Sequence, residues 1–148
     1  MKILLVSINA KYIHTNPAVY LLRANAAEFR NDVKIREFTI NQSPDEILQE
    51  IVMEQPDFIG FSCYIWNIDM VKKLISECKK LLPDTVFWLG GPEAEANAKQ
   101  LLQTYPQIDG VMYGEGENIS LHRPQVFLCF SGVRRERIGP AYHKPCCG

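Results

Sequence analysis

The chain has 148 residues, of which 47% are hydrophobic and 22% charged, and its formal net charge at pH 7 is −1. These values predict one soluble domain with a substantial core, and they give no electrostatic reason to expect nucleic acid or an anionic membrane as a partner. No apolar run approaches the ~18 residues that a membrane-spanning helix needs. Five cysteines without the spacing of a disulfide framework predict a reducing, cytoplasmic environment.

The apolar pattern alternates between strand-like and helix-like segments along residues 2–113. Residues 57–62 and 85–89 are continuous apolar runs, which are typical of strands buried on both faces of a parallel sheet. Residues 33–40 alternate and carry charges, which is typical of a half-exposed edge strand. The predicted elements, in chain order, are a strand at 2–8, a helix at 17–30, a strand at 33–40, a helix beginning at Pro44, a strand at 57–62, a helix at 68–82, a strand at 85–89, a helix at 93–104 and a strand at 108–113.

Strands and helices that alternate through short connections predict an α/β fold. We expect a doubly wound, Rossmann-like or flavodoxin-like parallel sheet of five strands in the order 2-1-3-4-5, with helices on both faces. The N-cap and proline pair Asn16-Pro17 and the capping box that begins at Ser43 support two of the helix starts. This strand order places the topological switch point, where such sheets bind ligands, between strands one and three.

The last 31 residues do not continue this pattern. Residues 118–148 are basic, rich in proline and glycine, and without helical periodicity, although residues 126–130 could form a short strand. We therefore expect a domain at residues 1–117, followed by a weakly ordered tail or one foreign to the domain, such as a truncated gene or a frame change would produce.

Four predicted loops, at 9–17, 62–67, 90–93 and 113–117, meet at the carboxyl edge of the sheet. Gly90 and Gly91 would let a ligand lie against bare backbone, or they simply make a tight turn. The Ser62 hydroxyl could bond a ligand amide or phosphate, or it could cap the local backbone. His14 could be a metal ligand, a general base or an exposed loop residue.

Several common site types lack their residues in this sequence. Gly114-Glu-Gly-Glu117 is not followed by the lysine and hydroxyl residue of a P-loop, and no glycine-rich dinucleotide fingerprint follows the first strand. Ser62 lacks the flanking glycines of a nucleophile elbow. The cysteines have no metal-binding spacing, and His143 with Cys146-Cys147 is a poor zinc corner. No acid–base pair or nucleophile stands out, so we predict no catalytic residue.

The combination of loops resembles the N-terminal cobalamin-binding domain of cobalamin-dependent radical S-adenosylmethionine (SAM) proteins. That fold carries Asp-x-His-x-x-Gly after strand one, Ser-x-Leu after strand three and Gly-Gly after strand four. The corresponding segments here are Tyr12-Ile-His14-Thr-Asn-Pro17, Ser62-Cys63-Tyr64 and Gly90-Gly91. The stretches KILLVSINAKYIHTNPA, IGFSCYIWN, LGGPE and GEGE resemble the radical SAM subgroup in particular. The resemblance covers about residues 1–117.

The resemblance implies a cobalamin site at the carboxyl edge, with the nucleotide tail passing Gly90 and Gly91. The resemblance implies His14 as the axial ligand of cobalt. Tyr12 and Pro17, however, replace the Asp and Gly of the motif. This resembles the radical SAM members, whose cobalt typically has no protein histidine beneath it. The cofactor-binding residues that it implies are Asn9, Tyr12, His14, Ser62, Cys63, Tyr64, Trp66, Gly90, Gly91, Pro92, Gly114, Glu115 and Gly116.

The resemblance also implies a parent enzyme, a methyltransferase or a related protein, with a radical SAM barrel as the partner domain. The Cys-x-x-x-Cys-x-x-Cys motif that would hold a [4Fe–4S] cluster and SAM does not occur in this sequence. We therefore expect a chain truncated before that domain, which binds cobalamin and is not catalytic alone. The alternative is a cofactor-free flavodoxin-like regulatory or interaction domain, with Tyr12, Tyr64 and Trp66 as contact anchors.

Overall fold

A computed structural model describes residues 1–11, 15–26, 29–114 and 132–134. The strands of this part are β1 (Ile3–Asn9), β2 (Val33–Thr39), β3 (Phe58–Ser62), β4 (Val86–Gly90), β5 (Gly110–Met112) and β6 (Gly132–Arg134). Its helices are α1 (Pro17–Ala24), α2 (Pro44–Glu54), α3 (Ile68–Leu81), α4 (Pro92–Ala96) and α5 (Ala98–Thr104). None of the helices in the described ranges is long and apolar enough to cross a bilayer.

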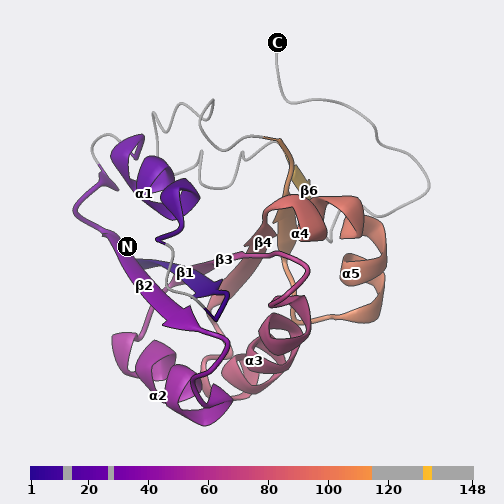
Figure 1. Cartoon of the computed structure of the whole chain (residues 1–148), viewed down its shortest axis with the longest axis horizontal. Coiled ribbons are helices and arrows are strands. Elements are labelled where there is room, and N and C mark those ends of the chain that lie inside the picture. The colour runs from indigo at the N-terminus through magenta and orange to yellow at the C-terminus, as the bar shows by residue number, and fades with distance from the viewer. Residues whose placement is uncertain (12–14, 27–28, 115–131, 135–148) are drawn as a thin grey trace.

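The strands form one sheet in the order β2-β1-β3-β4-β5-β6 (Figure 1). The first five are parallel, which confirms the predicted fold and order. β6 pairs antiparallel with β5 and was not predicted. It lies within the predicted irregular tail, and the possible strand at residues 126–130 falls outside the described residues. Ser7 of β1 and Gly90 of β4 both pair with Ser62, so three strand ends meet at one height.

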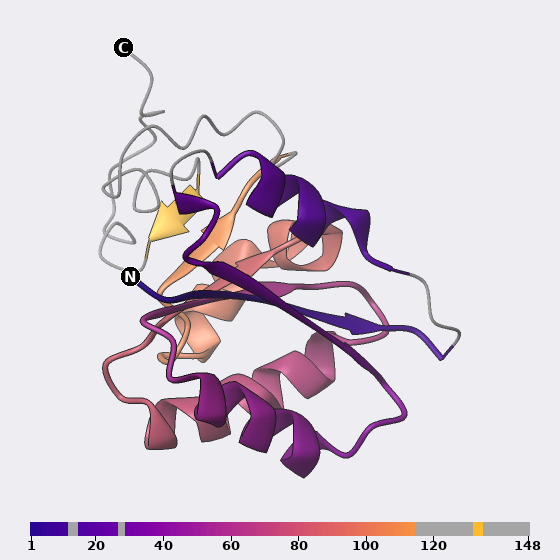
Figure 2. The ribbon, with the colours of Figure 1, turned by 90° about the vertical axis from the view of Figure 1, so that its left-hand side faces the viewer.

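The two faces of the sheet are covered unequally. Figure 2 shows α1 on one side and α2 and α3 on the other. The larger core joins α2, α3, α4 and α5 to the sheet through buried residues such as Ile51, Val71 and Leu101. The smaller core joins Val19 of α1 to Leu5, Trp88 and Met112 on the opposite face. Of the described helices, α1 is the one whose residues pack on this second face.

Side-chain caps begin two helices as predicted. Asn16 Oδ1 accepts the backbone N–H of Ala18 at 3.1 Å, and Ser43 Oγ accepts that of Asp45 at 3.3 Å. Pro17 and Pro44 follow these caps, where a proline loses no helical hydrogen bond.

Two predicted helices have different bounds in the structure. The first ends at Ala24 instead of residue 30, because the backbone N–H groups of Ala26 and Phe29 bond three residues back and tighten the chain into turns. The predicted helix at 93–104 is divided into α4 and α5 at Asn97. The Asn97 side chain donates to the Glu93 carbonyl at 3.0 Å, which takes the place of a helical bond and allows the break.

Candidate functional site

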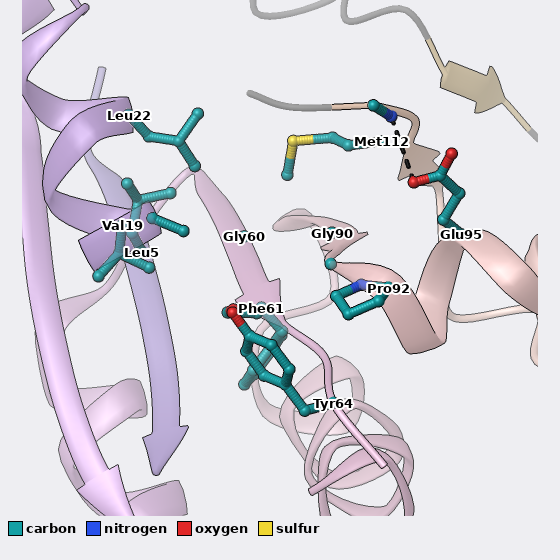
Figure 3. A pocket seen from close by; sticks show the side chains of 14 residues that line it. Leu5, Val19, Leu22, Gly60, Phe61, Tyr64, Gly90, Pro92, Glu95 and Met112 are labelled. Carbon is teal, nitrogen blue, oxygen red and sulfur yellow. Dashed lines mark hydrogen bonds between the residues drawn. The ribbon is translucent and has the colours of Figure 1, made fainter. Parts of the chain in front are cut away.

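A cavity of about 340 Å³ lies between α1 and the carboxyl ends of β3, β4 and β5. In Figure 3, Leu5, Val19 and Leu22 stand on one side of it and Met112 on the other, with Gly60 between them. The remaining lining includes Phe61 and Ala18 and residues at the carboxyl edge, which are Ser62, Tyr64, Gly90, Gly91, Pro92, Glu95 and Gly114. The cavity is thus apolar inside and has its polar side chains at the sheet edge.

Gly60 and Gly90 form the floor of this cavity. A Cβ atom on Gly90 would lie 3.3 Å from Met112 Cε, and one on Gly60 would lie 3.0 Å from Leu5 Cδ2. Larger side chains at these positions would occupy the space between α1 and β5. The cavity therefore exists because two neighbouring strands have no side chains at this point.

Gly91 is required for a different reason. Its φ of +96° is unfavourable for other residues, and a Cβ there would lie 2.6 Å from the Cys63 carbonyl oxygen. This close approach is held by backbone hydrogen bonds from Cys63 N–H to the Gly90 carbonyl (2.7 Å) and from Glu93 N–H to the Cys63 carbonyl (3.4 Å). Gly91 therefore fixes the loops after β3 and β4 against each other at the mouth of the cavity.

A buried polar network joins the ends of β1, β2 and β3 to the start of α1. Asn16 Nδ2 donates to Ser62 Oγ at 2.8 Å and to Ser7 Oγ at 3.1 Å. Ser7 Oγ donates to Asn9 Oδ1 at 2.7 Å, and Asn9 Nδ2 donates to Glu37 Oε1 at 3.2 Å. The network positions α1, which carries one wall of the cavity. Within the network the Ser62 hydroxyl only accepts, so its hydrogen can be donated to a ligand.

Glu37 is the anionic end of this network. Burial raises the pKa of Glu37, but hydrogen bonds from the Asn16 backbone N–H (3.0 Å), the Tyr20 hydroxyl (2.7 Å) and the Asn9 amide outweigh burial and hold the pKa below its ordinary value of 4.5. These bonds favour the charged form because a carboxylate accepts hydrogen bonds more strongly than a carboxylic acid does.

We expect Glu37→Gln to lower the free energy of unfolding at neutral pH and to lose this effect in acid. Since the folded pKa lies below 4.5, the carboxylate stabilises the fold above that pH, and this contribution disappears as the pH falls through the folded pKa. Urea unfolding of the original chain and the Glu37→Gln variant between about pH 7 and pH 3 measures the difference in their free energies of unfolding. Glu54, whose pKa is lowered by Lys34 and Arg36, is present in both proteins and cancels in the difference. A difference that stays constant with pH would contradict this role.

The loop after β3 presents aromatic groups at the sheet edge. The Tyr64 and Trp66 rings stack at 4.5 Å with an interplanar angle of 3°, and Trp66 Nε1 donates to the Ile8 carbonyl at 3.3 Å. Asn67 holds the loop by donating to the Ile8 and Ser62 carbonyls and accepting from Tyr64 N–H. Ile65 is 79% exposed and Trp66 is 47% exposed. The rim of the site is therefore an apolar surface that ring stacking and hydrogen bonds hold in place.

The structure brings six of the predicted cofactor-binding residues to the cavity lining: Ser62, Tyr64, Gly90, Gly91, Pro92 and Gly114. Asn9 belongs to the polar network, and Trp66 lies at the rim without lining the cavity. The Cys63 thiol is completely buried in the larger core, and this burial raises its pKa well above the ordinary value, so only its backbone contributes at the site. Tyr12, His14, Glu115 and Gly116 lie outside the described residues.

Sequence reasoning missed the interior of the cavity and most of the network. Leu5, Val19 and Leu22 have the pattern of ordinary core residues, and Asn16 gave only the signal of a helix cap. Gly60 in the middle of an apolar strand was a usable signal, because a glycine there often marks a close approach of a ligand or a backbone.

A mainly parallel open sheet with a cavity beside its switch point defines a flavodoxin-like α/β domain. The sequence model of the family described as "B12 binding domain" matches residues 3–122 of this chain. The chain therefore belongs to the B12-binding domain family.

The name of one curated relative includes cobalamin, and the name of another includes a protoporphyrin. The cobalamin-dependent radical SAM methyltransferase TokK of Streptomyces tokunonensis is 30% identical over 63 residues, which are 43% of this chain and 9% of that protein. The anaerobic magnesium-protoporphyrin IX monomethyl ester cyclase of Rubrivivax gelatinosus is 27% identical over 97 residues, or 66% of this chain and 18% of that protein. This chain thus spans less than a fifth of either relative.

A solved structure shares the fold. The cobalamin-dependent SAM radical enzyme OxsB, with aqua-cobalamin and SAM bound, aligns with a TM-score of 0.63 at 15% identity, covering 80% of this chain and 17% of OxsB. At this identity the similarity concerns the fold alone.

Proposed function

We propose that this chain is the cobalamin-binding domain of a B12-dependent radical SAM enzyme and that it holds the corrin at the carboxyl edge of the sheet. Membership of the B12-binding family supports the cofactor, and the name of TokK supports the radical SAM context. The observation that carries the proposal is the glycine-floored cavity, because it lies where this fold class binds its ligands.

The size and lining of the cavity fit one part of the cofactor. Its volume of about 340 Å³ is at the low end of small-molecule pockets and is too small for a whole cobalamin, but it suits the flat base and ribose of the nucleotide tail. Ser62 would donate a hydrogen bond to the tail, and Gly60 and Gly90 would let its base lie against the strands. Tyr64 would cover the tail at the mouth. Bound cobalamin supplies a cobalt centre that can carry a methyl group or an electron.

The radical chemistry belongs to the parent enzyme in this proposal. The [4Fe–4S] cluster and SAM would be held by a radical SAM barrel, because this sequence lacks the three clustered cysteines. The exposed Ile65 and Trp66 would be covered by the corrin or by that barrel, which accounts for apolar groups at the rim. The same exposure is what favours the second candidate, an interaction domain without a cofactor.

Titration of the full chain with hydroxocobalamin tests the proposal. We expect cobalamin to remain with the protein through gel filtration and its visible spectrum to change, because a base held in the cavity cannot coordinate cobalt. An unchanged spectrum together with no retention would overturn the proposal. Protection of residues 64–66 by a partner protein in that case would favour the interaction domain.

We propose His14 as the candidate protein ligand of cobalt, carried by the loop between β1 and α1. If it coordinates cobalt, His14→Ala will shift the visible spectrum of the bound cofactor, and imidazole added to the variant will restore the original spectrum. An unchanged spectrum would show that His14 does not coordinate cobalt. Lys11→Ala in the same loop is the control, because its side chain is exposed.

A further inference from the structure

The interior of the cavity offers a buried ligand very few hydrogen bonds. Leu5, Val19 and Leu22 face Met112 across Gly60 (Figure 3). The β3 backbone behind Gly60 pairs with β1 on one side and with β4 on the other. A ligand group in this space therefore meets methyl and methylene groups and strand backbone that already has partners.

The polar side chains of the lining stand at the sheet edge, and two of them accept hydrogen bonds from within the protein. Ser62 Oγ accepts from Asn16 Nδ2 at 2.8 Å, and Glu95 Oε2 accepts from Gly114 N–H at 3.3 Å. The Tyr64 ring is fixed by its stacking on Trp66. These groups can bond the sugar and phosphate of a tail at the mouth, and they leave the base to the apolar interior.

Natural corrinoids differ in the base that ends their nucleotide tail. A dimethylbenzimidazole base is mostly apolar, whereas adenine adds ring nitrogens and an amino group. Burying such polar atoms without partners costs free energy, because their hydrogen bonds to water are lost. Burying the two methyl groups of dimethylbenzimidazole is favourable, because it removes apolar surface from water.

We propose that this cavity selects among corrinoids by their lower base and prefers dimethylbenzimidazole to adenine. Leu22 and Met112 are the specificity-determining residues, because they form opposite walls around the base. This inference rests on the proposed function, since it requires the nucleotide tail to occupy the cavity.

Equilibrium titration of the full chain with three corrinoids tests the inference. These are cobalamin, its adenine analogue, and cobinamide, which has no nucleotide tail. We expect cobalamin to bind at least about tenfold more tightly than either of the others, which corresponds to about 1.4 kcal/mol. Equal affinity for cobalamin and the adenine analogue, or for cobalamin and cobinamide, would overturn the inference and leave cobalamin binding intact. Failure of all three to bind would overturn the proposed function as well.

A pair of variants on α1 shows whether the wall sets this preference. Leu22→Gln places a donor and an acceptor beside the base, and we expect it to reduce the preference for cobalamin about tenfold. Leu21→Gln is the matched control, because Leu21 is 40% exposed and does not line the cavity. Met112→Gln repeats the test from the other wall if Leu22→Gln does not fold. An unchanged preference in a folded wall variant would overturn the assignment.

Discussion

Replacing Gly90 by valine is expected to reduce cobalamin affinity at least tenfold, or by about 1.4 kcal/mol, without weakening the fold. The new side chain would project from the cavity floor toward Met112, whose methyl group is 3.3 Å from the position of the added Cβ. Met112 is flexible and can move aside, but the valine would then occupy the space of the nucleotide tail. A titration monitored by visible absorption measures the loss.

The stability of Gly90→Val separates blocked binding from misfolding. A β-branched residue is favourable in a strand, and replacing glycine restricts the unfolded chain, so the free energy of unfolding should stay constant or rise by up to about 1 kcal/mol. Ala96→Val on the exposed surface of α4 is the matched control, and its cobalamin affinity should equal that of the original chain. Undiminished cobalamin binding by a folded Gly90→Val variant would place the tail elsewhere.

Asn16→Ala is expected to lower the free energy of unfolding by about 2 to 4 kcal/mol. The substitution removes the cap of α1 and the amide donor to Ser7 and Ser62, so the buried Ser7 oxygen and the half-buried Ser62 oxygen each lose a donor. Such a loss is a large part of the stability of a small domain, which is typically about 5–15 kcal/mol. Chemical denaturation followed by circular dichroism measures it.

Two further variants separate the cap from the network. Ser43→Ala removes a more exposed N-cap at α2, and it should cost only about 1 kcal/mol. Asn16→Asp keeps an acceptor for Ala18 but loses both donated bonds and places a charge near Glu37, so it should remain clearly less stable than the original chain. If Asn16→Ala costs no more than Ser43→Ala, the network does not stabilise the start of α1.

The sheet and its strand order could be predicted because local patterns determine them. Continuous apolar runs at 57–62 and 85–89 are typical of strands covered on both faces of a parallel sheet, and the alternating charges of 33–40 are typical of an edge strand, which is where β2 lies. The helix starts were correct for the same reason, because Asn16 and Ser43 bond to backbone groups two residues away. The end of the first helix and the break at Asn97 depend on local turns that replace helical hydrogen bonds, and the apolar pattern did not show these turns.

The sequence alone determined the fold class and placed Ser62 and the glycines Gly90, Gly91 and Gly114 at the carboxyl edge of the sheet, where they line the cavity of the candidate site. Only the tertiary structure decided that Leu5, Val19, Leu22 and Met112 line a cavity, that Asn16 links β1, β2 and β3, and that the Cys63 thiol points into the core. The physical reason is that these outcomes depend on contacts between residues far apart in the chain. Apolar side chains produce the same periodicity whether they line a ligand cavity or fill a core.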